Sequence, residues 1–124
     1  MKITDCINSS EKTVFSIEVL PPVKGMGLTK LFESIDRISE FNPQYINITT
    51  HHSEYVYTDV GNGMFKRSAI RRRPGTVAVA TAIMHRYNIP VVPHILCNGF
   101  TPEETEYVLI DLQLSGITDL LLLR

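Results

Sequence analysis

One carboxylate stands in the middle of an apolar run near the start of the chain, in the segment FSIEVLPP that spans residues 15–22. Glutamate is depleted in strands and is almost never fully buried without a partner, so Glu18 requires either a partner or a chemical task. The structural alternative is an ion pair between Glu18 and a lysine or arginine across the sheet. Glu18 is therefore the first candidate for a residue that does chemistry.

Histidine and cysteine residues could bind a metal ion or form a disulfide, and their spacing in the sequence bears on both. His51 and His52 are adjacent, and adjacent residues of a strand point to opposite faces, so this pair makes a poor chelate for a metal ion. Cys6 and Cys97 are far apart and show no C-x-x-C spacing, which favours two free thiols. We predict no metal site and no disulfide framework.

The composition is that of an ordinary globular protein, with 124 residues, 44% hydrophobic, 20% charged and a net charge of -1. This length suffices for one hydrophobic core, and we treat residues 1–124 as a single domain. A net charge this close to zero gives no excess of positive charge that would attract nucleic acid or an anionic membrane. The apolar runs are shorter than a membrane span, and the N-terminus has no apolar signal region. We expect a cytoplasmic protein that binds neither nucleic acid nor membrane.

Apolar periodicity and turn residues predict strands that alternate with helices. The β-rich or uniformly apolar runs predict strands at 13–20, 45–50, 91–96 and 119–123. Helical spacing and the capping signals predict helices at 28–40, 76–87 and 102–115. The clearest local signal is TPEE (101–104), a capping box with proline at the first helical position, and Gly116 marks the end of that helix.

Two architectures compete for this alternating pattern, because both pair parallel strands through right-handed crossovers. An open doubly wound sheet usually has a glycine-rich phosphate loop after the first strand. Here that turn is PPVKGMG (21–27), which is too little for a dinucleotide fingerprint. A (β/α)₈ barrel typically needs about 250 residues. We therefore predict an α/β fold that is the truncated first half of a TIM barrel, with about four parallel strands and three helices.

In barrel proteins the functional site forms at the C-terminal ends of the strands. Several polar residues of this sequence fall at such positions. Glu18, Thr49, His94 and Arg124 each lie at or just after the end of an expected strand. We predict that they share one site at that edge, although strand ends are polar in many α/β proteins.

Several linked motifs then carry a family resemblance. They occur in the order FSIEVLPP (15–22), SIDRISEFNPQYINIT (34–49), PHILC (93–97), TPEE (101–104) and GITDLLLLR (116–124). Together they resemble the N-terminal part of the methylenetetrahydrofolate reductase family. The resemblance implies a (β/α)₈ barrel that holds FAD. It also implies that a hydride passes from NAD(P)H to the flavin and then to methylenetetrahydrofolate, which becomes methyltetrahydrofolate.

The resemblance gives Glu18 a role, because it matches the family's general acid, which helps to open the five-membered ring of the folate. An acid with that task gains from an apolar setting, since desolvation disfavours the carboxylate form. The flanking Phe15, Ile17, Val19 and Leu20 are expected to provide this setting.

The resemblance also implies contacts with the FAD cofactor from the strand ends. The expected cofactor-binding residues are Thr49, Thr50, His52, His94 and Arg124. The commoner family pattern after Thr49 is Tyr-Gly-Ala, so an aromatic contact from position 50 is lost and backbone contacts remain. Without the resemblance, an imidazole hydrogen-bonded in the barrel wall remains an alternative interpretation of His94.

The segment 51–75 is long for a connection between a strand and a helix, whose usual length is about 2–6 residues. Such loops over a barrel mouth are often binding lids, in which Tyr55 and Tyr57 are placed to stack on a ring. For Arg71–Arg73 we weigh contact with a phosphate or a glutamate tail against a solvated basic start to the next helix, and we favour the solvated start.

Three functions remain open from the sequence. The first is a flavin-dependent folate reductase of which this chain is an N-terminal fragment, inactive and unable to hold FAD tightly by itself. The second is a non-catalytic half-barrel subunit that binds a nucleotide or folate, and the third is an unrelated α/β barrel enzyme. Because a half-barrel has open strand edges, we expect a homo-oligomer.

Overall fold

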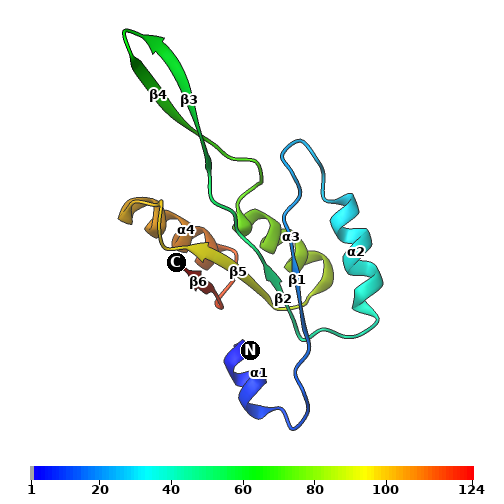
Figure 1. Cartoon of the computed structure of the whole chain (residues 1–124). Coiled ribbons are helices and arrows are strands. Elements are labelled where there is room, and N and C mark those ends of the chain that lie inside the picture. Colours follow the sequence, from blue (N-terminus) through cyan, green and yellow to red (C-terminus); the bar gives the residue numbers. More distant parts are fainter. Residues whose placement is uncertain (1) are drawn as a thin grey trace.

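Four parallel strands form the central sheet of the computed structural model, which describes residues 2–124. The strands pair side by side in the order β1 (Ser16–Val19), β2 (Tyr45–Ile48), β5 (Val91–Leu96) and β6 (Leu121–Leu123). Their spatial order follows the chain, and every pairing is parallel. The predicted α/β class is confirmed, and the arrangement is consistent with a partial barrel-like fold (Figure 1).

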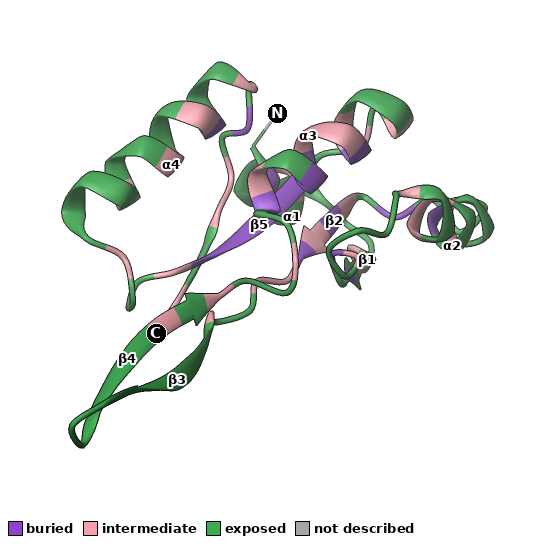
Figure 2. Cartoon of the chain, turned by 90° about the horizontal axis from the view of Figure 1, so that it is seen from above, coloured by how far each residue is buried: buried purple, intermediate pink, exposed green. Residues whose placement is uncertain are grey.

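Three helices connect these strands and lie on one face of the sheet (Figure 2). They are α2 (Thr29–Ser39), α3 (Thr76–Tyr87) and α4 (Pro102–Leu114), each within one residue of its predicted bounds. The capping box of α4 is formed as predicted. The backbone N–H of Glu104 donates to Thr101 Oγ1 at 3.2 Å, and the backbone N–H of Thr101 donates to Glu104 Oε2 at 2.8 Å.

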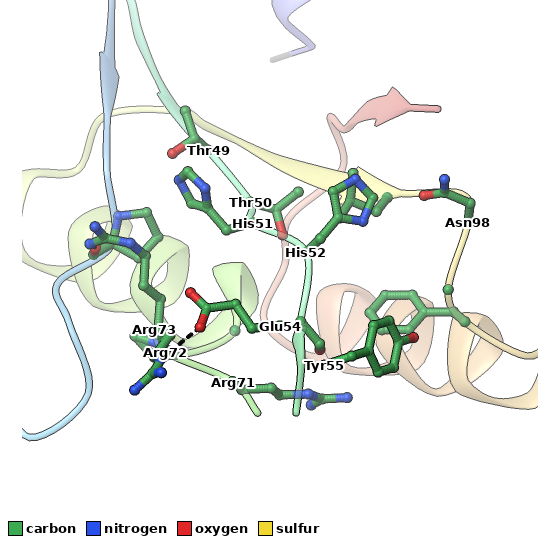
Figure 3. A pocket seen from close by; sticks show the side chains of 17 residues that line it. Thr49, Thr50, His51, His52, Glu54, Tyr55, Arg71, Arg72, Arg73 and Asn98 are labelled. Carbon is green, nitrogen blue, oxygen red and sulfur yellow. Dashed lines mark hydrogen bonds and ion pairs between the residues drawn. The ribbon is translucent and has the colours of Figure 1, made fainter. Parts of the chain in front are cut away.

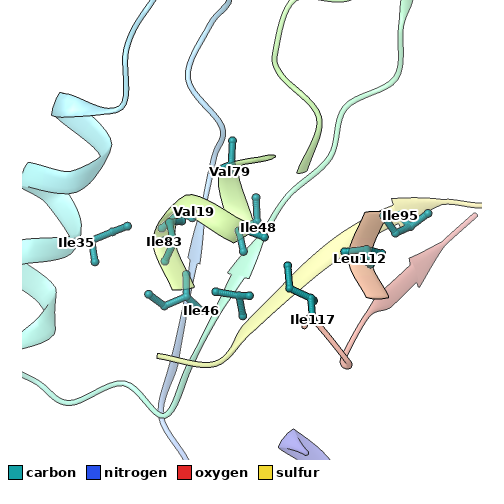
Figure 4. Packing of buried hydrophobic residues seen from close by; sticks show 11 residues of the cluster. Val19, Ile35, Ile46, Ile48, Val79, Ile83, Ile95, Leu112 and Ile117 are labelled. Atoms are coloured by element: carbon teal, nitrogen blue, oxygen red, sulfur yellow. The ribbon is translucent and has the colours of Figure 1, made fainter. Parts of the chain in front are cut away.

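The hydrophobic core lies between the helices and this face of the sheet (Figure 4). Ile46 and Ile48 of β2 and Ile95 of β5 are buried against Ile83 of α3 and Leu112 of α4. Side chains alternate along each strand, so the intervening residues point to the other face. This second face carries Glu18 and His94, the polar residues singled out from the sequence.

Helix α1 (Ile3–Ser9) was not predicted, because its heptapeptide is too short and too polar to show a helical period. It lies near the edge where the strands begin (Figure 1). The backbone N–H of Ile3 donates to Asp119 Oδ1 at 3.0 Å, which ties the helix to the turn before β6. Among residues 2–124, no helix combines the length and apolarity needed to cross a membrane.

An antiparallel hairpin occupies much of segment 51–75, which we expected to be a loop. Its strands β3 (Glu54–Gly61) and β4 (Met64–Ile70) extend beyond the C-terminal edge of the parallel sheet (Figure 1). Asn62 and Gly63 have φ values of 55° and 72°, as a type I′ turn requires. The Asn-Gly pair was therefore a readable hairpin signal, and the expectation of an irregular loop was wrong.

Candidate active site

Glu18 and His94 approach each other across β2, although they belong to strands that do not pair. Glu18 is in register with Asn47, and Asn47 with Val92, which places His94 one alternation further along β5. Glu18 Oε2 lies 3.9 Å from His94 Nε2, too far for a hydrogen bond. An acid and an imidazole thus face the same cavity near the C-terminal edge of the sheet.

The two side chains differ sharply in exposure. The His94 side chain is 6% exposed, whereas that of Glu18 is 60% exposed. Val19 and Leu20 of the expected apolar setting line the same cavity as Glu18, but the expected burial of its carboxylate is wrong. Ile17 and Val19 adjoin Glu18 in sequence, but alternation turns them toward the helices, so they enclose the core and leave the carboxylate uncovered.

His94 is held from its backbone and leaves one ring nitrogen free. The Thr76 hydroxyl donates to the His94 carbonyl oxygen at 3.2 Å, which joins the start of α3 to β5. Within residues 2–124, His94 Nε2 is buried and has no hydrogen-bond partner. Buried polar atoms are normally paired, so this nitrogen points to a missing partner, such as a bound group.

Thr49 ends β2 and ties it to β1. Its backbone N–H donates to the Val19 carbonyl oxygen at 3.0 Å, and its hydroxyl donates to the same oxygen at 3.4 Å. Thr49 and Thr50 line an open cavity together with Glu18 and His94. The structure thus brings four of the predicted site residues together, while the roles assigned to them stay predictions.

A neighbouring cavity of about 400 Å³ lies at the base of the hairpin (Figure 3). It shares Thr49, Thr50 and His51 with the Glu18–His94 cavity. His52 lines only the cavity at the hairpin base, so it is separated from Glu18. Arg124 is exposed after β6 and lines neither of these two cavities.

Sequence reasoning missed several residues that line the cavity at the hairpin base. Glu54 enters it from the start of β3, while Asn98 and Phe100 enter from the loop between β5 and α4. The rule that barrel sites include the loops after the strands would have identified Asn98 and Phe100. Among residues 2–124, no group of three or more histidine, cysteine or acidic side chains is placed to hold a metal ion.

The strand order and the gathered polar side chains define the class of protein. This is an α/β protein whose four-strand parallel sheet is consistent with part of a barrel, and the candidate site lies at the C-terminal edge of these strands. Residues 2–124 match the family described as methylenetetrahydrofolate reductase, and the chain belongs to that family.

Two plant proteins are similar to the whole chain. The chain is 26% identical over 127 residues to "Methylenetetrahydrofolate reductase (NADH) 1" of Arabidopsis thaliana. It is also 26% identical over 127 residues to "Probable methylenetetrahydrofolate reductase (NADH)" of Oryza sativa subsp. japonica. Each alignment covers 100% of this chain and 19% of the relative, so the chain spans about a fifth of the length of these proteins.

Proposed function

We propose that this chain forms part of the catalytic barrel of an NAD(P)H-dependent flavoenzyme that reduces 5,10-methylenetetrahydrofolate to 5-methyltetrahydrofolate. Membership of the family supports the folate reaction, and the names of both plant relatives support a nicotinamide reductant. The observation that carries the proposal is the placement of the Glu18 carboxylate 3.9 Å from the His94 imidazole, in an open cavity at the C-terminal sheet edge.

One feature of the cavity supports a contact with the flavin that this reaction would need. Among residues 2–124, His94 Nε2 is buried without a hydrogen-bond partner, and a polar ring edge that enters the cavity would give it one. We propose that Thr49, Thr50, His52, His94 and Arg124 hold FAD. When bound, FAD would supply the hydride relay between the nicotinamide and the folate.

Glu18 is proposed to supply the proton for the folate step. Its carboxyl group is open to the cavity, so a ligand entering there reaches it without rearrangement of the strand. The proton would go to the ring nitrogen that leaves when the five-membered ring of the folate opens. A bound ligand would also exclude water from this carboxyl group.

The test is Glu18→Gln in the complete reductase that carries this chain, with the two half-reactions measured separately by stopped flow. We expect reduction of the flavin by the nicotinamide to change by less than about 2-fold. Reoxidation by the folate should slow by about 10²- to 10⁴-fold, the usual contribution of a general acid. Glu33→Gln on the exposed surface of α2 is the matched control. Equal losses in both half-reactions would show that Glu18 is not the proton donor.

A non-catalytic half-barrel that binds a nucleotide or folate is the second candidate. The exposure of Glu18 favours it, because an acid in contact with water lacks the desolvated setting typical of general acids. The same variant separates the two functions. In a purely binding protein the folate does not reoxidise the flavin, so Glu18→Gln leaves this rate unchanged at zero.

We also propose that the chain associates with itself. β1 and β6 are edge strands with one partner each, and the side chains of Leu121 and Leu122 are exposed on β6. Such edges promote pairing between chains. Light scattering at micromolar concentration should report a dimer or larger species, and a monodisperse monomer would contradict this proposal.

A further inference from the structure

Three consecutive arginines line the cavity at the base of the hairpin, which we call the arginine cavity. Arg71, Arg72 and Arg73 follow β4 and precede α3, and Figure 3 shows them with Glu54 and His51 around the cavity. The sequence interpretation of these arginines was a solvated start to the next helix. Arg71 and Arg72 are exposed to solvent, as that interpretation expected, and all three arginines also line a cavity of about 400 Å³.

The charges in this wall do not balance. Arg72 Nε lies 3.0 Å from Glu54 Oε2, and Glu54 is the one acidic side chain among the described lining residues. Among the lining residues, three guanidinium groups and one carboxylate leave a formal excess of two positive charges, of which the nearby Glu104 carboxylate offsets part through its interaction with Arg71. An excess of this kind, gathered around a concave surface, favours an anionic ligand.

The arginine segment is held in position by the loop after β1. The guanidinium of Arg73 donates to the Pro21 carbonyl oxygen, which fixes the side chain and leaves its charge uncancelled. The backbone N–H of Lys24 donates to the Arg72 carbonyl oxygen at 2.7 Å. Less conformational entropy is therefore lost when Arg73 binds a ligand than for a free surface arginine.

The first turn of α3 adds to the positive potential of the arginine cavity. Pro74 and Gly75 line the cavity, and Gly75 is the N-cap residue of a twelve-residue helix. Within residues 2–124 no side chain caps this end, so its first N–H groups lack the usual partner. The partial positive charge of a helix N-terminus favours the same kind of ligand as the arginines do.

We propose that the arginine cavity is a binding subsite for the anionic end of an extended ligand, with Arg72 and Arg73 as the principal contacts. The shared residues Thr49, Thr50 and His51 place it next to the Glu18–His94 cavity. A ligand whose ring lies beside His94 therefore extends its phosphates or carboxylates toward the arginines. The identity of that ligand rests on the proposed function, whereas the affinity for an anion does not.

The experiment measures anion binding by isothermal titration calorimetry on the 124-residue chain, at low and at physiological salt. Inorganic pyrophosphate is the probe for the phosphates of a dinucleotide, and triglutamate is the probe for the carboxylate tail of a folate. Binding of the first probe assigns the subsite to phosphates, and binding of the second assigns it to carboxylates. The titration contains neither flavin nor folate, so failure of the reductase proposal leaves its result unchanged.

Three variants test the residues that carry the inference. Arg73→Gln should weaken binding by about 10-fold or more, the usual effect of losing a charge-assisted hydrogen bond. Glu54→Gln should strengthen it several-fold, because Arg72 loses its competing carboxylate. Arg37→Gln on exposed α2 removes an equal charge elsewhere and should change binding by less than about 2-fold.

Two results would overturn the inference. One is the absence of binding for both probes, and the other is an equal effect of Arg73→Gln and Arg37→Gln, which would indicate unspecific charge attraction. If Arg73→Gln unfolds the chain, as circular dichroism would show, the opposite sign expected for Glu54→Gln still decides the matter. Unchanged or weaker binding in Glu54→Gln would then contradict the subsite.

Discussion

The parallel sheet and the hairpin of this protein are both β-structures, yet they are stabilised in different ways. In β5, five of the six residues are buried, whereas every residue of β3 is exposed. The sheet forms because its strands pack on three helices, with Ile46, Ile48 and Ile95 in the core. The hairpin depends on its Asn62-Gly63 turn and on contacts between its own strands. Tertiary burial therefore supports one region, and local sequence supports the other.

The largest effect should come from a core residue of the sheet. Ile48 is fully buried, and Ile48→Ala should lower the free energy of unfolding by about 2–5 kcal/mol through lost burial and a residual cavity. Urea denaturation followed by circular dichroism measures this loss. The matched hairpin variant, Val60→Ala, should lower it by less than about 0.5 kcal/mol, because Val60 is exposed. Similar losses for both variants would remove the distinction between the two regions.

A smaller effect is expected at the start of α4, where a local signal supports an element of the packed region. Thr101→Ala removes the hydroxyl that accepts from the Glu104 N–H, and it should destabilise the chain by about 1 kcal/mol. The same urea titration checks this value. A negligible change would mean that packing of α4 against the sheet makes the cap redundant.

The same cap should make stability depend on pH. The backbone N–H and then the hydroxyl of Thr101 lower the pKa of Glu104, because both donate to its carboxylate. A lowered pKa in the folded state gives stability that is present above the unfolded pKa and is lost as the pH falls through the folded pKa. Unfolding measured between about pH 6 and pH 3 should therefore show a smaller acid-side loss in Glu104→Gln. Its neighbour Glu103→Gln is the control and should behave like the unmodified chain.

The smallest effect on global stability should come from the hairpin turn. Gly63 has φ of 72°, a conformation that a residue with a side chain rarely adopts, so Gly63→Ala should loosen the hairpin. Hydrogen exchange should accelerate at the amides of β3 and β4 and stay unchanged in β5. Acceleration throughout the sheet would show that the two regions unfold as one unit.

The sequence predicted the packed region well, because each of its elements carries its own signal. Each of these elements has a signal of its own: the apolar period of α2, the capping box of α4 at Thr101, and the mostly apolar run of β5. Strand and helix alternation then leaves few topologies, which is why the parallel order was predictable. The hairpin was not predicted, although GNG (61–63) is a turn signal, because the length of segment 51–75 suggested a lid. The short helix α1 had no comparable signal.

The candidate site was predictable only in part. The parallel topology predicts that the C-terminal ends of the strands meet at one edge of the sheet. It therefore predicts a common location for Glu18, Thr49 and His94. The cavity that gathers Arg71–Arg73 opposite Asn98 and Phe100 was not predictable, since it depends on how three loops meet. Sequence periodicity predicts helices and strands, but it does not predict how close two loops lie in space.

By itself, then, the sequence determined the order of the elements, the parallel sheet and the edge at which polar residues gather, because these follow from period, capping and connection rules. Only the tertiary structure decided how exposed each side chain is and which charges share a wall. Glu18 and His94 show the reason. They lie 3.9 Å apart on one face, yet His94 is enclosed by its neighbours and Glu18 is not, because enclosure depends on the packing of distant segments around each position.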